Sequence, residues 1–327
     1  MMDNYSIDIF LSTNTLVLLF SDFIIVCLQF LVFFSVIKIL LKWDFNSTSL
    51  EQYKLEEKSY FVMLILYFTF IIKIILYPYF IYVLDSLSNI IPGAMCGAGV
   101  ISANSYGEPL LIIKTIILFL SAIWIVINIF DIKQKHSFFM KTKSKIYLIL
   151  FVFVIVEFIL QIKFFSSLST QSLVTCCSII YSADQSANGL PFNISLVLLL
   201  IVFYLTSILL FISNYKQNIF YSFFLALTFI YFSYYSVIYF FGTYIYELPT
   251  HHCPFCMLQK DYYYIGYFIF ASLFLTTFFG ILNFILKYTI DKTKNSYFKI
   301  SNIFLVIFIT ILTSYVICFY IKNGVFL

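Results

Sequence analysis

The sequence predicts an all-α, polytopic integral membrane protein with about eight transmembrane helices and both termini outside. Of its 327 residues, 62% are hydrophobic and only 10% are charged. A soluble domain of this length has too little interior to bury so much apolar surface. Several apolar runs reach the roughly 20 residues that a helix needs to cross a bilayer. We therefore expect residues 1–327 to form a single transmembrane helical domain.

The apolar runs are separated by short polar segments, and each run predicts one helix. The eight helices are expected at about residues 13–41, 60–84, 109–131, 146–163, 195–213, 219–244, 254–286 and 299–321. Lysines are concentrated after the first, third, fifth and seventh helices, whereas the loops 85–108, 164–194 and 245–253 have almost none. Because basic loops stay on the cytoplasmic side of a membrane, every odd-to-even loop is predicted to be cytoplasmic.

The net charge of +4 comes from these inner loops and gives no reason to expect nucleic acid as a partner. The expected partner is the lipid bilayer. We place the protein in a bacterial inner (cytoplasmic) membrane, so that its outer loops face the periplasm.

Five of the seven cysteines fall on the predicted outer side of the membrane: Cys96, Cys176, Cys177, Cys253 and Cys256. The periplasm is oxidising, so disulfide or metal chemistry is plausible there. Glycines around Cys96 allow the backbone to approach another group closely. Adjacent Cys176 and Cys177 pair with each other only through a strained peptide. One of them is therefore expected to pair with Cys96 or to serve as a thiol.

The most informative motif lies at residues 251–256, which read His-His-Cys-Pro-Phe-Cys at the start of the seventh predicted helix. Proline is favoured at the first helical position, which makes Cys253 the expected cap. The N–H groups of a first helical turn stabilise a thiolate. Lys260 would add a cation one turn below Cys256. The sequence therefore predicts an activated thiol pair.

Four interpretations of this pair remain open. The two cysteines cycle between dithiol and disulfide, or they hold a soft ion together with His251 or His252. In the second case the ion is copper or zinc, and Cys96 and Met95 are further candidate ligands. The third interpretation is an inert structural disulfide. The fourth is a pair of small buried hydrophobic side chains.

Residues 253–260, Cys-Pro-Phe-Cys-Met-Leu-Gln-Lys, resemble the start of the first cysteine-bearing helix in the DsbB-type membrane disulfide oxidases. The resemblance implies that Cys256 faces a quinone and that Cys253 exchanges with a loop disulfide. Lys260 stands where that family has arginine, and Gln259 beside it is a second candidate quinone contact. Electrons would come from a periplasmic thioredoxin-like partner. That family has about four helices and a second cysteine pair after the motif, whereas here only Cys318 follows.

Charged residues inside the predicted helices form a second expectation. Lys73 and Glu157 lie at similar depths, so we expect them to approach each other, with Asp22 and Lys114 as a second pair. We expect these buried ion pairs to lock the helices together, in preference to forming a route for protons.

Taken together, the sequence favours a membrane thiol–disulfide oxidoreductase with an outward-facing Cys-x-x-Cys centre, with quinone as the candidate acceptor. The alternative is an accessory membrane protein that handles or transports copper or another soft metal for a periplasmic metalloprotein. A third class is a permease subunit whose cysteines only brace its outer loops. The residues leave open whether the chain is an enzyme.

Overall fold

The structure is a computed structural model that describes residues 12–44, 49–133, 138–169 and 195–327, together with Phe10, Ser47 and Val174. These residues form helices and contain no strand. Eight helical spans in this part of the chain are long and apolar enough to cross a membrane. The protein is therefore an all-α, multi-pass membrane protein, as its sequence predicts. The orientation of its termini stays a prediction.

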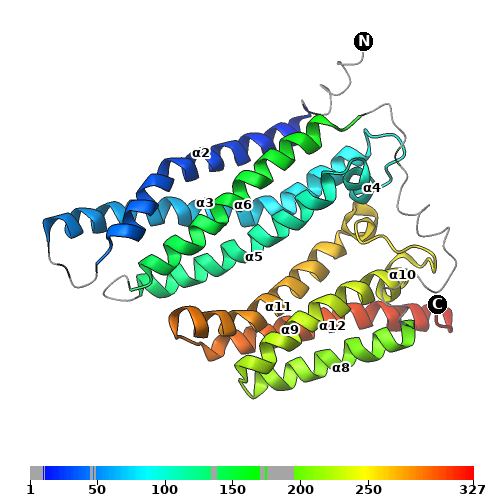
Figure 1. Ribbon diagram of the computed structural model, residues 1–327. Helices are drawn as coiled ribbons and strands as arrows, with labels where there is room; N and C mark the ends of the chain where they lie inside the picture. The colour runs from blue at the N-terminus through cyan, green and yellow to red at the C-terminus, as the bar shows by residue number, and fades with distance from the viewer. Residues whose placement is uncertain are drawn as a thin grey trace, which may run out of the picture. The chain divides into compact units, whose positions relative to one another are not determined.

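The helices are α2 (Thr13–Lys42), α3 (Leu50–Ser88), the short α4 (Gly97–Ser102), α5 (Gly107–Ile132), α6 (Met140–Ser166), α8 (Leu196–Tyr215), α9 (Ile219–Ser236), α11 (Ile265–Ile290) and α12 (Asn295–Asn323) (Figure 1). The span that begins with α9 continues through a π-helical turn, η2 (Val237–Phe241), and ends in α10 (Gly242–Tyr246). Most of these bounds lie within a few residues of the predicted ones. The long α3 is an exception, because its polar first turns precede the predicted apolar run.

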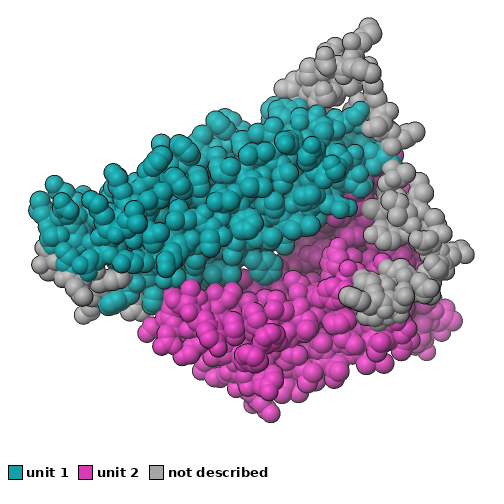
Figure 2. All heavy atoms as spheres, in the orientation of Figure 1, with its two compact units in different colours: residues 1–92, 100–174 teal, residues 93–99, 175–327 magenta. Residues whose placement is uncertain are grey.

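The chain divides into two compact units. Unit 1 comprises Met1–Pro92 and Val100–Val174, and unit 2 comprises Gly93–Gly99 and Thr175–Leu327 (Figure 2). In unit 1, α2 packs against α3 and α6, and α5 packs against the same two helices. In unit 2, α9 packs against α8 and α11, and α12 packs against the same two helices. Each unit is therefore a circuit of four consecutive long helices. Whether the chain acts as a single domain stays a prediction.

Four of the buried charged side chains of unit 1, one from each of its long helices, lie together. The Nζ atom of Lys73 lies 2.6 Å from Asp22 Oδ1 and 2.6 Å from Glu157 Oε2. The Nζ atom of Lys114 lies 2.5 Å from Glu157 Oε1 and 3.5 Å from Asp22 Oδ2. None of the four side chains is more than 5% exposed. Both predicted approaches are confirmed, and they close into one ring of alternating charge that links all four helices.

The seventh transmembrane helix differs from its predicted range of 254–286. α11 begins only at Ile265, and the residues before it form two short 3₁₀ helices, η3 (Cys256–Leu258) and η4 (Lys260–Tyr262). Tyr263 and Tyr264 then adopt left-handed backbone conformations, with φ of 53° and 57°. A right-handed helix is incompatible with two such residues.

The expectation that Cys253 caps this helix is therefore wrong, because the N-cap of α11 is Tyr264. Lys260 is likewise not one helical turn below Cys256 in a continuous helix. The helix-terminus argument for an activated thiolate does not apply to α11.

Candidate functional site: a three-thiol cluster in unit 2

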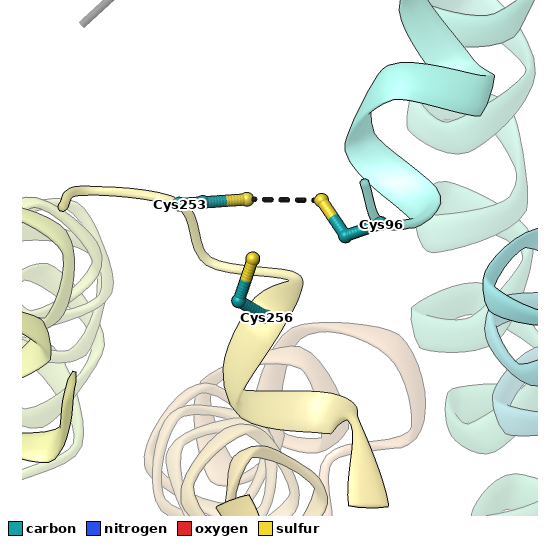
Figure 3. Close-up of side chains that lie close together, drawn as sticks. All are labelled: Cys96, Cys253 and Cys256. Atoms are coloured by element: carbon teal, nitrogen blue, oxygen red, sulfur yellow. Dashed lines mark hydrogen bonds between the residues drawn. The ribbon is translucent and has the colours of Figure 1, made fainter. Parts of the chain in front are cut away.

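Three cysteine side chains meet within unit 2. The Sγ atoms of Cys96 and Cys253 are 3.4 Å apart, and the sulfurs of Cys96, Cys253 and Cys256 all lie within 4.8 Å of one another. Figure 3 shows Cys96 just before α4, Cys253 in the segment after α10, and Cys256 at the start of η3. The residues are 0%, 2% and 7% exposed, respectively. A disulfide needs about 2.05 Å, so Cys96 and Cys253 are in contact without being bonded.

The segment 93–99 brings Cys96 to this cluster. It belongs to unit 2, although the chain on both sides of it belongs to unit 1. The Gln259 side-chain amide donates a hydrogen bond to the Met95 carbonyl at 3.2 Å. The turn after Cys96 closes through a 3.0 Å bond from Gly99 N–H to the Cys96 carbonyl. A Cβ atom at Gly99 would come within 3.1 Å of Ala94, so glycine here allows a close backbone approach that a larger residue would crowd.

Tyr246, the last residue of α10, is hydrogen-bonded to the backbone on both sides of the cysteine pair. Its hydroxyl donates to the Cys253 carbonyl and accepts a 3.0 Å hydrogen bond from Met257 N–H. Its ring meets the rings of His251 and Tyr262 edge-on, with centroids 4.4 and 4.8 Å away. Sequence reasoning missed this residue, because nothing in its spacing from the cysteines distinguishes it from the many other tyrosines.

The two histidines flank the cluster. The Nδ1 atom of His252 lies 3.3 Å from the Ile238 carbonyl in η2, and its ring centroid is 5.3 Å from that of Tyr239. Within the described part of the chain, the buried Nε2 of His251 makes no hydrogen bond. Burial lowers the pKa of His251, and the nearby Cys96 opposes this shift. Burial also lowers the pKa of His252, against the hydrogen bond to Ile238. Both imidazoles are therefore neutral at pH 7.

The other predicted site residues are less central. Neither His251 nor His252 belongs to the group of potential metal ligands, which among the described residues consists of the three cysteines. Lys260 is exposed in η4, and Gln259 makes the contact to Met95 given above. Cys176 and Cys177 lie outside the described residues.

Comparison of the chain with family models, curated proteins and solved structures gives no match. The fold and the cluster together define a multi-pass membrane protein with three adjoining buried thiols.

Proposed function

We propose that the protein is a membrane thiol–disulfide oxidoreductase whose centre is formed by Cys96, Cys253 and Cys256. The supporting observation is that three buried sulfurs lie within 4.8 Å of one another, two of them contributed from positions 157 residues apart. Disulfide exchange requires an attacking thiolate next to a disulfide, with a third sulfur as the leaving group. Three adjoining cysteines supply these roles. We place the centre on the periplasmic side of a bacterial inner membrane.

The proposed reaction balances in three steps. A quinone takes two electrons and two protons from Cys253 and Cys256, which gives hydroquinone and a Cys253–Cys256 disulfide. The Cys96 thiolate then attacks Cys253, forms a Cys96–Cys253 bond and releases the Cys256 thiolate. A periplasmic thioredoxin-like dithiol finally attacks Cys96, forms a mixed disulfide, and resolves it with its second thiol. The products are the partner's disulfide and the two regenerated cysteines.

The test uses the purified protein with a reduced thioredoxin-like protein and a soluble quinone analogue. Sustained hydroquinone formation should require all three cysteines, so that Cys96→Ser, Cys253→Ser and Cys256→Ser each abolish turnover, with Cys96→Ser still giving a single equivalent. Cys27→Ser and Cys318→Ser are matched controls, because these cysteines are exposed on α2 and α12, and they should retain the rate. Turnover that survives Cys253→Ser would overturn the proposal.

A second candidate function is soft-metal handling, which the close approach of three sulfurs also favours. Thiolates select Cu(I) and Zn(II), and zinc usually takes a fourth ligand. In this case the protein would deliver copper or assemble a periplasmic metalloprotein. Anaerobic purification followed by thiol counting and metal analysis separates the two functions. Stoichiometric copper that is lost in Cys96→Ser would favour metal handling, whereas titration of the three cluster thiols without bound metal would favour exchange.

A further inference from the structure

The hydroxyl of Tyr246 lies between two backbone groups of the segment that carries Cys253 and Cys256. In a regular α-helix, the N–H of each residue donates to the carbonyl four residues earlier. Met257 N–H would therefore donate to the Cys253 carbonyl. Here both groups bond to the Tyr246 hydroxyl, which accepts from Met257 N–H and donates to the Cys253 carbonyl. The tyrosine is inserted into the hydrogen bond that would close a helical turn around the two cysteines.

The neighbouring backbone bonds show that this turn is open. Leu258 N–H donates to the Phe255 carbonyl at 3.0 Å, and Gln259 N–H donates to the Cys256 carbonyl at 3.0 Å. Both are 3₁₀-type bonds, and they begin after Cys253. The Tyr246 hydroxyl is buried, so its two partners have no solvent to replace it. Removal of the hydroxyl would leave Met257 N–H and the Cys253 carbonyl to bond to each other.

We propose that Tyr246 is a positioning residue that controls which disulfide the cluster forms. With the turn open, the Cys253 sulfur contacts Cys96 at 3.4 Å. Cys253 and Cys256, whose sulfurs already lie within 4.8 Å of each other, would with the turn closed be held three residues apart on one helical face, where they are positioned to pair with each other. The hydroxyl therefore favours the Cys96–Cys253 disulfide over the Cys253–Cys256 disulfide. This inference rests on the proposed exchange among the three cysteines and assigns its regulation to one side chain.

The test variant is Tyr246→Phe, which keeps the ring and removes only the hydroxyl. Tyr244→Phe is the matched control, because Tyr244 is a buried tyrosine of the same short helix whose hydroxyl accepts from Leu327 N–H instead. Both variants are made in a background with Cys176→Ser and Cys177→Ser, so that these thiols do not compete. The proteins are oxidised with a glutathione redox buffer, in which oxidised glutathione takes up the electrons, and the disulfides are mapped by mass spectrometry.

Tyr246→Phe should raise the ratio of the Cys253–Cys256 to the Cys96–Cys253 disulfide by about fivefold for each hydrogen bond removed. Tyr244→Phe should leave this ratio within about twofold of the parent. An unchanged ratio in Tyr246→Phe would overturn the inference, even if catalysis by the three cysteines were established. A shifted ratio would support it even if no quinone were reduced, so the two proposals fail separately.

If Tyr246→Phe does not fold, hydrogen exchange of the Met257 amide in the unsubstituted protein tests the same hydrogen bond. The chain has 6 methionines, so ¹⁵N-methionine labelling gives few amide signals, and Met257→Leu identifies that of Met257. Because this N–H is bonded to a buried hydroxyl, its exchange with deuterium should be slowed at least tenfold relative to an unprotected amide. Unprotected exchange would contradict the inserted hydrogen bond.

Discussion

The ring of four charges in unit 1 makes a quantitative prediction about stability. Glu157→Gln removes one of two carboxylates that face two buried lysines. Lys114 would keep only Asp22 at 3.5 Å, and the ring would carry an uncompensated positive charge. Breaking a buried ion pair from one side costs about 3–5 kcal/mol. We expect Glu157→Gln to lower the free energy of unfolding by that amount.

A second substitution should recover part of this loss. Lys114→Met in the Glu157→Gln background restores neutrality and leaves the 2.6 Å pair between Lys73 and Asp22 intact. The double variant should be about 1–3 kcal/mol more stable than the sum of the single effects predicts. Lys143→Met is the matched control. Its Nζ pairs with Asp131 Oδ2 at 2.6 Å, outside the ring, so its effect should simply add to that of Glu157→Gln.

The assay follows tryptophan fluorescence during unfolding by SDS in mixed micelles. Both tryptophans of the chain, Trp43 and Trp124, are buried in unit 1, so the signal reports on the unit that contains the ring. A cost below about 1 kcal/mol for Glu157→Gln, or compensation by Lys143→Met equal to that by Lys114→Met, would contradict the electrostatic coupling of the ring.

Three further predictions concern unit 2 and use the rate at which a maleimide labels the buried cysteines. Because burial lowers the pKa of His251 below its ordinary 6.5, the unfolded chain takes up a proton at higher pH than the folded one. Stability should therefore fall as the pH drops below about 6.5. The labelling rate, divided by that of a free thiol at the same pH because maleimide reacts with the thiolate, should rise, and His251→Gln should flatten that dependence. Gly266→Ala should also accelerate labelling, because the added Cβ would lie 2.6 Å from Met257 Cγ and overpacking costs about 1–3 kcal/mol; a rate equal to that of the parent would contradict this packing. Lys322→Ala removes an exposed 2.9 Å pair with Glu247 and should change stability by less than about 1 kcal/mol, so a larger effect would show that the pair is not solvent-screened.

The number and positions of the membrane helices follow from the sequence, because apolar length determines which segments can cross a bilayer. The residue at which α11 begins does not follow from the sequence. Pro254 and the following apolar residues favour a helix locally, but two bonds to Tyr246 and the left-handed Tyr263 and Tyr264 oppose it. These are contacts and backbone states that periodicity does not encode.

The buried charges illustrate the same limit. The depths of Lys73 and Glu157 predict their pairing, since a charge in the bilayer needs a partner. Closure of the ring through Asp22 and Lys114 depends on the packing order of four helices, which the sequence leaves undetermined. For the thiols, the predicted sidedness grouped Cys96 with Cys253, whereas their 3.4 Å separation required the structure.

The placement of Cys96 has a topological consequence. A covalent bond from Cys96 to Cys253 would enclose α5, α6, α8 and α9 in one closed loop of the polypeptide. A protease cut between α6 and α8 would then leave the two fragments joined, whereas the same cut in the reduced protein would separate them on a denaturing gel. The oxidation state of a single sulfur pair thus decides whether the chain behaves as one covalent piece after cleavage.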